Sequence, residues 1–386
     1  MSFCEEVEAG VGVISREKRM EFDEMVCLCA ISKVFAYKCA AGRQLMEAFG
    51  GPGAVFKAPR AALREALHRA DDYVDVLCDP ELLEWARTEV EWAKGCGVEL
   101  LPVGSSRYPF RLAQCADAPL LLYYKGNVDL NAPQILAVVG TRKATWYGRT
   151  MCRKIVERLA SLPVRPLVVS GLALGIDGTA HLAALEAGLQ TVGVMPTGLD
   201  DVYPHQHREL AARIIEHGAL VTDFARLTAP AAMTFIRRNR LIAGMADVTL
   251  LAESFARGGG LITVSLAESY GREVFAVPGR LTDPSFAGCH EVIRKNVAQI
   301  VTDTESLPLA MGWLQQKTGR KKAAERPGDS ALERTILALL AERGSLTTDD
   351  LTRLTGQDAS AVSVALFQLE VDGRVAVEFG NKYARL

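Results

Sequence analysis

The chain has 386 residues, of which 49% are apolar and 23% are charged, and its formal net charge is −2. This composition is typical of a globular protein of two or three domains and excludes a largely disordered chain. Nucleic-acid-binding proteins usually carry excess positive charge, so the average argues mildly against that class, but local patches rather than averages decide binding.

Nine cysteines are scattered along the chain, and no two of them form a C-x-x-C pair. This pattern predicts reduced thiols in a cytosolic protein rather than a zinc or redox site. The first twenty residues are too charged for a secretory signal, and no apolar run reaches the length of a membrane span. We therefore expect a cytoplasmic protein with no membrane segment, no metal and no cofactor.

Residues 1–100 are predicted to form a helical domain. Apolar residues recur at helical spacing between Leu28 and Phe49, Gly50–Gly53 breaks the chain, and a further helix is expected from about Pro80 to Gly95. This domain is either a small bundle that packs on its neighbour or a degenerate helix-hairpin-helix or SAM-like module. It lacks a glycine-rich hairpin for a DNA phosphate, which favours a packing or partner role.

Residues 101–309 alternate between short apolar runs and helical stretches. Such runs, apolar on both faces, are typical of a parallel sheet covered by helices, so we expect a doubly wound α/β domain. The predicted strands are Ile135–Val139, Leu167–Val169, Thr191–Met195, Ala219–Val221, Val248–Leu251, Glu273–Val277 and Gln299–Val301.

The C-terminal part is predicted to be a winged helix at 331–386, joined by a basic linker at 310–330. The linker carries Lys and Arg residues between 317 and 326 and is typical of a flexible tether. Beyond it, Thr347 or Thr348 is a candidate cap for a second helix, and Ser360 lies near the start of a third. Alternating apolar residues from Val375 onward then predict a wing hairpin.

Two glycine-containing loops follow the first two predicted strands. Gly140, Thr141 and Arg142 follow one strand, and Ser170 and Gly171 follow the next. Open α/β sheets bind ligands at the carboxyl ends of their strands, where glycine lets backbone N–H groups approach an anion. Neither loop has G-x-G-x-x-G or Walker A spacing, so dinucleotide or ATP binding is weakly supported. Because two such loops coincide and one carries an arginine, we expect a phosphate site rather than plain tight turns.

A basic segment follows later in the chain: Phe235 is followed closely by Arg237, Arg238, Asn239 and Arg240. Guanidinium groups bind phosphates and a ring can stack on a base, a combination that suits a single strand of nucleic acid. The alternative is a solvated basic helix start with the ring in the core, and composition alone does not decide between the two.

A third glycine-rich turn, Gly258–Gly260, follows the predicted strand that ends near Leu251 and precedes a helix that contains Thr263. Backbone N–H groups from Gly259 and Gly260 onward are placed to receive another phosphate, and a flexible connection is the competing interpretation.

Candidate catalytic groups are few. Asp177 and His181 lie four residues apart and would share a helix face, which permits acid–base chemistry or metal binding but more often holds a turn. Glu253 and Asp223 end predicted strands and are candidate helix caps. No nucleophile elbow, pair of catalytic carboxylates or metal-ligand cluster accompanies them, so we expect no catalytic residues.

Several stretches match, in this order, the pattern of a known family. They are Val138–Arg142, Val169–Asp177 with Ala180-His181, Gly198–Asp200 with Tyr203-Pro204, Phe235–Gly244, Gly259–Thr263, and Gly271-Arg272 with Val274–Gly279. Over roughly residues 100–305 the chain resembles the DNA-processing protein A (DprA/Smf) family, and the parts on either side fit that family's layout more loosely.

The resemblance implies an extended Rossmann-like fold that binds single-stranded DNA, a homodimer built through that domain, and recruitment of the RecA recombinase onto DNA in natural transformation. It places Arg142 in a phosphate pocket with Ser170 and Gly171. The residues it places along the path of the strand are Phe235, Arg237, Arg238, Asn239 and Arg240.

The chain departs from the family pattern at several positions. Leu174 stands where a basic residue is usual, which should remove one phosphate contact unless Arg237 and Arg257 compensate. Ile236 replaces a usual proline. Further differences are His207 and His290 in place of common asparagines, and Gly258–Gly260 in place of a Ser-Gly-Ser-like turn.

The third helix of the winged helix, expected at about Ala359 to Val371, contains Glu370 but no Lys or Arg. A helix that enters a DNA groove normally brings positive charge, so we predict that this module contacts protein rather than duplex DNA.

Two other functions stay open. A Rossmann-like nucleotide phosphoribohydrolase-type enzyme would use Asp177, His181 and Glu253, but the Pro-Gly-Gly-x-Gly-Thr motif of that lysine-decarboxylase-like family is absent. A winged-helix transcription regulator with an α/β sensor domain is disfavoured by the third helix, which lacks positive charge.

Overall fold

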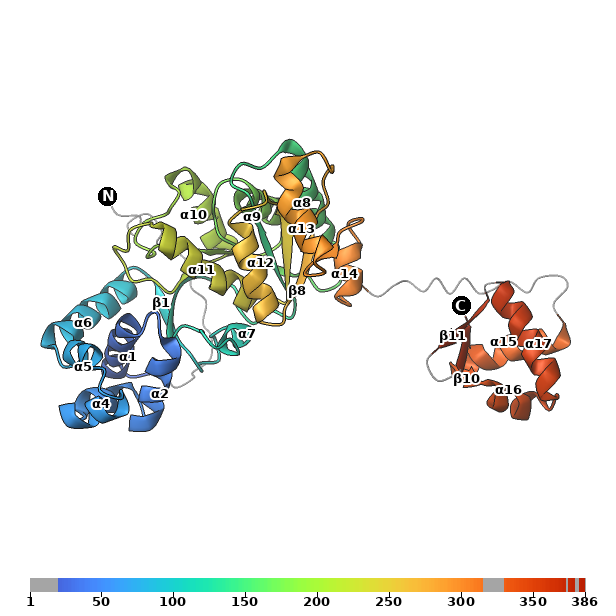
Figure 1. The fold of residues 1–386 in the computed structure, drawn as a ribbon, viewed down its shortest axis with the longest axis horizontal. Coiled ribbons are helices and arrows are strands. Elements are labelled where there is room, and N and C mark those ends of the chain that lie inside the picture. The colour runs from blue at the N-terminus through green and yellow to red at the C-terminus, as the bar shows by residue number, and fades with distance from the viewer. Residues whose placement is uncertain (1–19, 315–329, 373, 379–381, 386) are drawn as a thin grey trace. The chain divides into compact units, whose positions relative to one another are not determined.

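The computed structural model describes residues 20–314, 330–372, 374–378 and 382–385, and the chain divides into two units, residues 1–314 and 315–386 (Figure 1). Cys4 and the predicted basic linker residues 317–326 lie outside the described residues. Each unit has its own hydrophobic core and is described separately.

The first unit is built around a sheet in which the described residues form nine strands, in the order β1-β2-β6-β5-β4-β3-β7-β8-β9. Strands β3 to β9 are parallel, β2 is antiparallel to β6, and β1 is antiparallel to β2. The bounds are β1 (Glu99–Pro102), β2 (Leu121–Gly126), β3 (Ile135–Gly140), β4 (Leu167–Ser170), β5 (Thr191–Val194), β6 (Gly218–Thr222), β7 (Val248–Glu253), β8 (Glu273–Ala276) and β9 (Gln299–Ile300).

The seven strands predicted from apolar runs are confirmed as β3 to β9, with ends that differ by one or two residues. Residues 135–139 are all buried, as expected for a parallel strand covered on both faces. Strands β1 and β2 were not predicted, because they pair antiparallel and do not alternate with helices in the way that marks the parallel strands.

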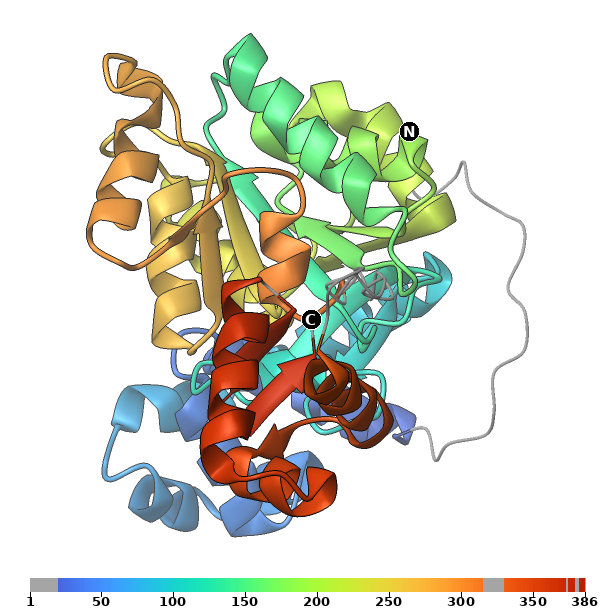
Figure 2. The same cartoon turned by 90° about the vertical axis from the view of Figure 1, so that its right-hand side faces the viewer.

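Two sets of helices cover opposite faces of the sheet. Helices α9 and α11 both pack against β3, β4 and β5, and they lie on opposite faces of the sheet (Figures 1 and 2). Helices α8 and α10 join the α9 side, and α12 joins the α11 side. The bounds are α8 (Trp146–Leu159), α9 (Ile176–Glu186), α10 (Arg208–His217), α11 (Ala232–Met245) and α12 (Gly260–Ser269).

The order of the strands fixes where a ligand can reach the sheet. From central β3 the chain adds β4, β5 and β6 on one side, and then crosses to add β7, β8 and β9 on the other. Loops that leave β3 and β7 therefore diverge to opposite faces and open a crevice at the carboxyl ends of these strands, the usual ligand position in open α/β sheets. Shorter helices complete the unit: α7 (Phe110–Ala113), η1 (His205–His207), η2 (Pro284–Phe286), α13 (Ala287–Arg294) and α14 (Ser306–Ala310).

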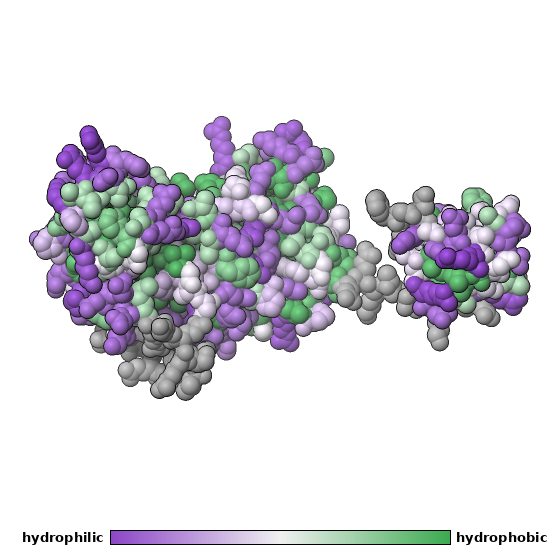
Figure 3. All heavy atoms as spheres, turned by 90° about the horizontal axis from the view of Figure 1, so that it is seen from below, coloured by the Kyte–Doolittle hydropathy of each residue, from purple (hydrophilic) through white to green (hydrophobic). Residues whose placement is uncertain are grey.

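The described N-terminal residues are helical, as predicted, and they pack on the antiparallel edge of the sheet. Their apolar cluster includes Leu120 and Leu121 at the start of β2, and Gly50 ends α2 in the left-handed conformation before Pro52 starts α3. Figure 3 shows apolar and hydrophilic residues interspersed on the drawn face of the first unit. The bounds are α1 (Phe22–Val34), α2 (Cys39–Phe49), α3 (Pro52–Lys57), α4 (Arg60–Ala66), α5 (Asp71–Leu77) and α6 (Pro80–Gly95).

The second unit is a winged helix, as predicted. Thr347 caps α16 by accepting a hydrogen bond from the N–H of Asp350. Asp358 caps α17, and Ser360 lies near the start of that helix, as predicted. The short strand β10 was not predicted. The bounds are α15 (Ala331–Arg343), β10 (Leu346–Thr347), α16 (Thr348–Thr355), α17 (Ala359–Val371), β11 (Val375–Glu378) and β12 (Lys382–Arg385), with strand order β10-β12-β11.

In the part of the chain that the structure describes, no helix combines the length and apolar character needed to span a membrane.

Candidate functional site

Three loops meet at the crevice between β3 and β7. The backbone N–H of Thr141, after β3, donates to the carbonyl of Glu253 at the end of β7, over 2.9 Å. The N–H of Ile176, after β4, donates to the carbonyl of Thr141 over 3.2 Å. Loops distant in sequence therefore form one hydrogen-bonded rim. This agrees with the prediction that the ligand site lies at the carboxyl ends of the strands.

Glycines let these loops approach each other. A Cβ on Gly140 would lie 2.6 Å from Cγ1 of Ile176 and 2.9 Å from the carbonyl oxygen of Glu253. Gly175 has φ of +84°, and a Cβ there would lie 2.3 Å from the carbonyl oxygen of Thr141. Gly260 packs against Gly140, since its Cβ would lie 3.3 Å from that Cα. The structure gives these glycines a packing role besides the ligand contact predicted for Gly140 and Gly260.

An exposed arginine and two aromatic rings gather above the rim. The guanidinium of Arg142 lies 4.4 Å from the ring centroid of Phe235 on α11, and Tyr203 from the loop after β5 meets the same ring edge-on at 5.7 Å. Arg142 is exposed, and Phe235 and Tyr203 are half-buried. A stacked guanidinium beside rings that are open to solvent offers both charge and a flat apolar surface.

Arg238 is buried below this group, and its guanidinium is held by the ends of two strands. Its Nη1 donates to the carbonyl of Gly171 over 2.5 Å and also to the carbonyl of Val194. Burial lowers the pKa of Arg238 to about 10, which leaves it charged at neutral pH, and the carboxylate of Asp177 partly offsets that cost. Arg238 thus neutralises carbonyl oxygens that would repel an anion at the rim.

Arg237 and Arg240 lie beyond the rim, at the end of β6. Both donate to Oδ2 of Asp223, and Arg237 does so over 2.7 Å. The structure therefore corrects one expectation about the basic segment: Arg238 and Arg240 are not open side chains along a path, because carbonyl and carboxylate partners hold them in the interior. A direct contact of either residue with a ligand stays a prediction that their burial disfavours.

The remaining predicted residues divide between the surface and the interior. Ser170 is buried and its hydroxyl donates to the carbonyl of Val138 over 2.6 Å, and Thr263 is buried in α12. Asn239 is half-buried and accepts from Nε of Arg238, whereas Gly259 is exposed at the start of α12. The buried positions can therefore contact a ligand through their backbone groups rather than through their side chains.

The candidate acid–base groups have structural partners. Glu253 accepts from the N–H and the hydroxyl of Thr145, the cap residue of α8. Asp177 is buried and accepts weakly from the N–H of Ala173, and His181 is buried with Nδ1 2.7 Å from the hydroxyl of Thr191. Among the described residues, no group of three or more potential ligands is arranged to hold a metal ion.

Tyr203 is the rim residue that sequence reasoning did not place in the site. Its ring is part of the aromatic group because the loop after β5 folds toward α11. The available signal was its position in the loop after a predicted strand. The same kind of position singled out the glycines and Arg142 in other loops.

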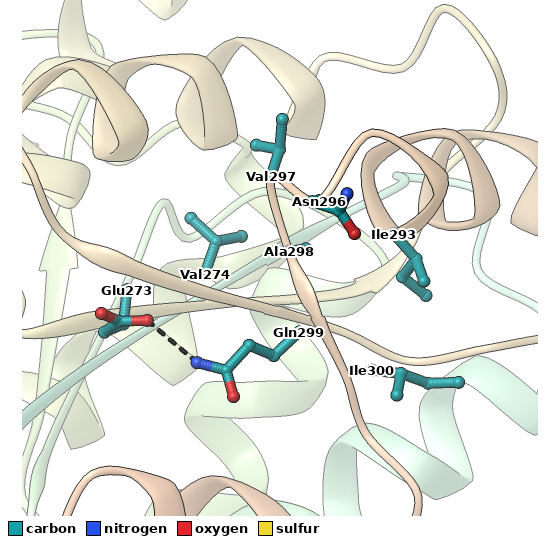
Figure 4. A pocket seen from close by; sticks show the side chains of 8 residues that line it. All are labelled: Glu273, Val274, Ile293, Asn296, Val297, Ala298, Gln299 and Ile300. Carbon is teal, nitrogen blue, oxygen red and sulfur yellow. Dashed lines mark hydrogen bonds between the residues drawn. The ribbon is translucent and has the colours of Figure 1, made fainter.

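Two pockets lie at the opposite edge of the sheet, near the amino ends of the strands. Figure 4 shows one of them, where Gln299 donates to the carboxylate of Glu273 over 3.0 Å beside apolar side chains. The other lies between Asn127 and His217. Neither pocket is lined by a Lys or Arg side chain or by a residue of the predicted site, so neither suits a phosphate.

Comparison with known families identifies the two units. The sequence model described as DNA recombination-mediator protein A matches residues 99–311, and that of the DprA winged helix domain matches residues 320–381. The chain belongs to the DNA recombination-mediator protein A (DprA) family. The resemblance inferred from the loop motifs is thereby confirmed.

Relatives of this DprA family member share much of its length. Protein Smf of Escherichia coli is 35% identical over 315 residues, which cover 79% of this chain and 83% of that protein. DNA processing protein DprA of Streptococcus pneumoniae is 39% identical over 200 residues, covering 52% of this chain and 70% of the relative.

Solved structures of the family share the fold. The structure of DprA from Streptococcus pneumoniae has a TM-score of 0.58 at 29% identity and covers 74% of this chain and 96% of that one. DprA from Helicobacter pylori, described for its single-stranded DNA binding mode, has a TM-score of 0.50 at 26% identity and covers 55% of this chain and 95% of that one.

Proposed function

We propose that this DprA family member binds single-stranded DNA across the rim formed by the loops after β3, β4, β5 and β7. The observation that carries the proposal is the stack of the Arg142 guanidinium on the Phe235 ring at the crevice between diverging loops. A guanidinium binds phosphate and a ring stacks on an unpaired base, so the pair suits a single strand better than a duplex whose bases are already stacked.

The charges around the rim favour an anion. Arg142 and Arg238 both interact with Asp177, which leaves one positive charge in excess there. Backbone N–H groups at the start of α12, from Gly260 onward, lie beside Gly140 and add the positive end of a helix. The exposed side chain at Leu174 contributes no charge, so Arg142 bears more of the binding than it would beside a basic residue.

Family membership supports a more specific function. We propose that the protein acts as a cytoplasmic homodimer that protects incoming DNA and loads RecA during natural transformation, without catalysing a reaction itself. Support for a non-catalytic role comes from the candidate acid–base groups: Asp177 and His181 are buried, and Glu253 is held by Thr145.

For the winged helix we propose a protein partner. Its third helix, α17, exposes the apolar side chains of Val364, Phe367 and Val371 rather than cations. These residues recur at three- and four-residue spacing and so share one face of the helix. Such a surface is typical of contact with protein rather than with a phosphate backbone.

Substitutions at the Arg142–Phe235 stack test the proposed DNA site. Arg142→Ala and Phe235→Ala should each weaken binding of a single-stranded oligonucleotide roughly tenfold, since one phosphate contact or one stacked base is lost. Arg165→Ala is the matched control, because Arg165 is exposed just before the amino end of β4, at the opposite edge of the sheet.

Fluorescence anisotropy with a labelled oligonucleotide measures these affinities. The proposal predicts that the control binds like the unmodified protein. If Arg142→Ala and Phe235→Ala bind the oligonucleotide as tightly as Arg165→Ala and the unmodified protein, the strand does not cross this rim.

A further inference from the structure

The loop between α1 and α2 presents an aromatic ring to solvent. Tyr37 is 71% exposed, and the guanidinium of Arg237, which belongs to α11, lies over its ring at 4.6 Å from the centroid. The same guanidinium lies 4.8 Å from the ring centroid of the buried Phe224. Arg237 thus contacts two rings and is fixed to Asp223. Most of the Tyr37 side chain stays open to solvent.

The order of the strands places Tyr37 in line with the proposed DNA site. Phe235 and Arg237 lie two residues apart on α11: Phe235 contacts Arg142 after β3, and Arg237 bonds Asp223 after β6. Strands β3, β4, β5 and β6 are consecutive neighbours in the sheet, so their carboxyl ends form a row of about 14 Å at the usual strand spacing. Tyr37 lies at the end of this row, on the helical N-terminal part.

The charge around Tyr37 suits a phosphate chain. Asp223 is shared by Arg237 and Arg240, and Asp117 also interacts with Arg240, so these four groups carry no net charge and leave the anion to a further cation. The exposed Lys38 follows Tyr37 directly, with its ammonium 5.0 Å from the ring centroid of Tyr73. An open ring next to cations is the arrangement by which proteins bind single strands without reading sequence.

We propose that Tyr37 is a second base-stacking site, which receives a base of the same DNA strand after it leaves the rim. This inference rests on the proposed function, because it extends the path of the strand from β3 past β6 onto the helical part. Strand length then decides whether the site is used: only an oligonucleotide that spans both positions gains from Tyr37.

The test compares Tyr37→Ala with the unmodified full-length protein on two oligonucleotides. On a strand of about 20 nucleotides, loss of the ring should weaken binding roughly tenfold, whereas on a dinucleotide, which is too short to span the row of about 14 Å, affinity should change less than twofold. Tyr37→Phe should retain the affinity for the long strand, and Tyr37→Leu, which keeps apolar contact with Arg237 but has no ring, should lose it.

Phe110→Ala is the matched control. Phe110 is also exposed, at 49%, with the Arg111 guanidinium 4.6 Å from its ring centroid and a carboxylate, Asp247, holding that arginine. It lies at the amino edge of the sheet, since Asp247 directly precedes β7, and so should have no effect on either strand.

Two results would overturn the inference while leaving the rim intact: equal affinity of Tyr37→Ala and unmodified protein for the long strand, or equal loss on both strands. If Arg142→Ala also leaves both affinities unchanged, the proposed function fails as well. The Arg142→Ala variant therefore distinguishes failure of the Tyr37 site from failure of the rim.

Discussion

At the scale of single residues, Asp223 organises the basic segment. One carboxylate oxygen accepts from both Arg237 and Arg240, so two of the three arginines are turned from the rim toward the end of β6. Arg238 is turned inward by the carbonyls of Gly171 and Val194. Arginines that are close in sequence thus have distinct structural roles. The exposed cation at the Phe235 ring is Arg142, which comes from a different loop.

Removal of Arg240 should act on stability. In Arg240→Ala, Asp223 stays buried but keeps Arg237 as its partner, so we expect a loss of about 1.5–3 kcal/mol in the free energy of unfolding of the first unit, the cost of one hydrogen bond to a charged group. Urea denaturation measures it. A variant as stable as the original, but with weaker DNA binding, would show instead that Arg240 contacts the strand.

His181 should make the first unit sensitive to acid. Burial lowers its pKa to about 3, so the folded protein keeps it neutral while the unfolded chain protonates it near pH 6.5. The unfolded state then binds more protons between these values, and stability falls as pH drops from about 6.5 toward 3.

The variant His181→Asn isolates this effect. Thr191 donates its hydroxyl proton to the carbonyl of Val168, so His181 must donate from Nδ1, and the asparagine amide supplies a donor in its place. Stability measured between pH 7 and 5 should decline more steeply for the original, by up to ~1 kcal/mol per pH unit. Parallel declines would contradict a neutral buried imidazole. Burial also raises the pKa of Asp177, but Asp177 is present in both proteins, so its contribution to the pH dependence of stability cancels in the comparison.

At the scale of elements, the sequence predicts the parallel strands well and the site only in part. Runs that are apolar on both faces predict β3 to β9 because such strands are buried on both sides. Loop glycines predict which strand ends meet, and Gly140 and Gly260 do lie together. The burial of Arg238 and Arg240 was not predictable, because their partners, Gly171, Val194 and Asp223, come from distant strands.

Two glycines of the rim should respond differently to the same change. Gly140→Ala puts a methyl group against Ile176 and the Glu253 backbone and should cost about 1–3 kcal/mol of stability as well as DNA affinity. Gly259→Ala meets no atom within 4 Å of the new Cβ, so its stability should be unchanged. If the DNA backbone approaches Gly259 closely, this variant nevertheless binds more weakly.

Thermal unfolding and anisotropy measured on the same two proteins separate these effects. Unchanged DNA affinity in a stable Gly259→Ala variant would remove this glycine from the proposed contact set.

At the scale of the whole molecule, two separately folded units divide the proposed work. The first unit carries the rim and the cations, and the second has its own core of residues such as Ile336, Leu351 and Leu366. Because α17 exposes apolar side chains and no cation, we expect the second unit to add little to DNA binding by itself.

Truncation after Leu314 tests that division. The shortened chain keeps the complete core of the first unit and should bind single-stranded DNA within about threefold of the full protein, the small difference arising from the cations at 317–326. A loss of duplex binding of tenfold or more on truncation would instead assign duplex contact to the winged helix.

The most direct test of the DNA-binding proposal is a salt titration of affinity for matched single-stranded and double-stranded oligonucleotides. The account predicts tighter binding of the single strand, an affinity that falls as salt rises, and a slope of log affinity against log salt that is shallower by about 0.7 in Arg142→Ala, because one phosphate contact is lost. Binding that is indifferent to salt, or that favours the duplex, would contradict it.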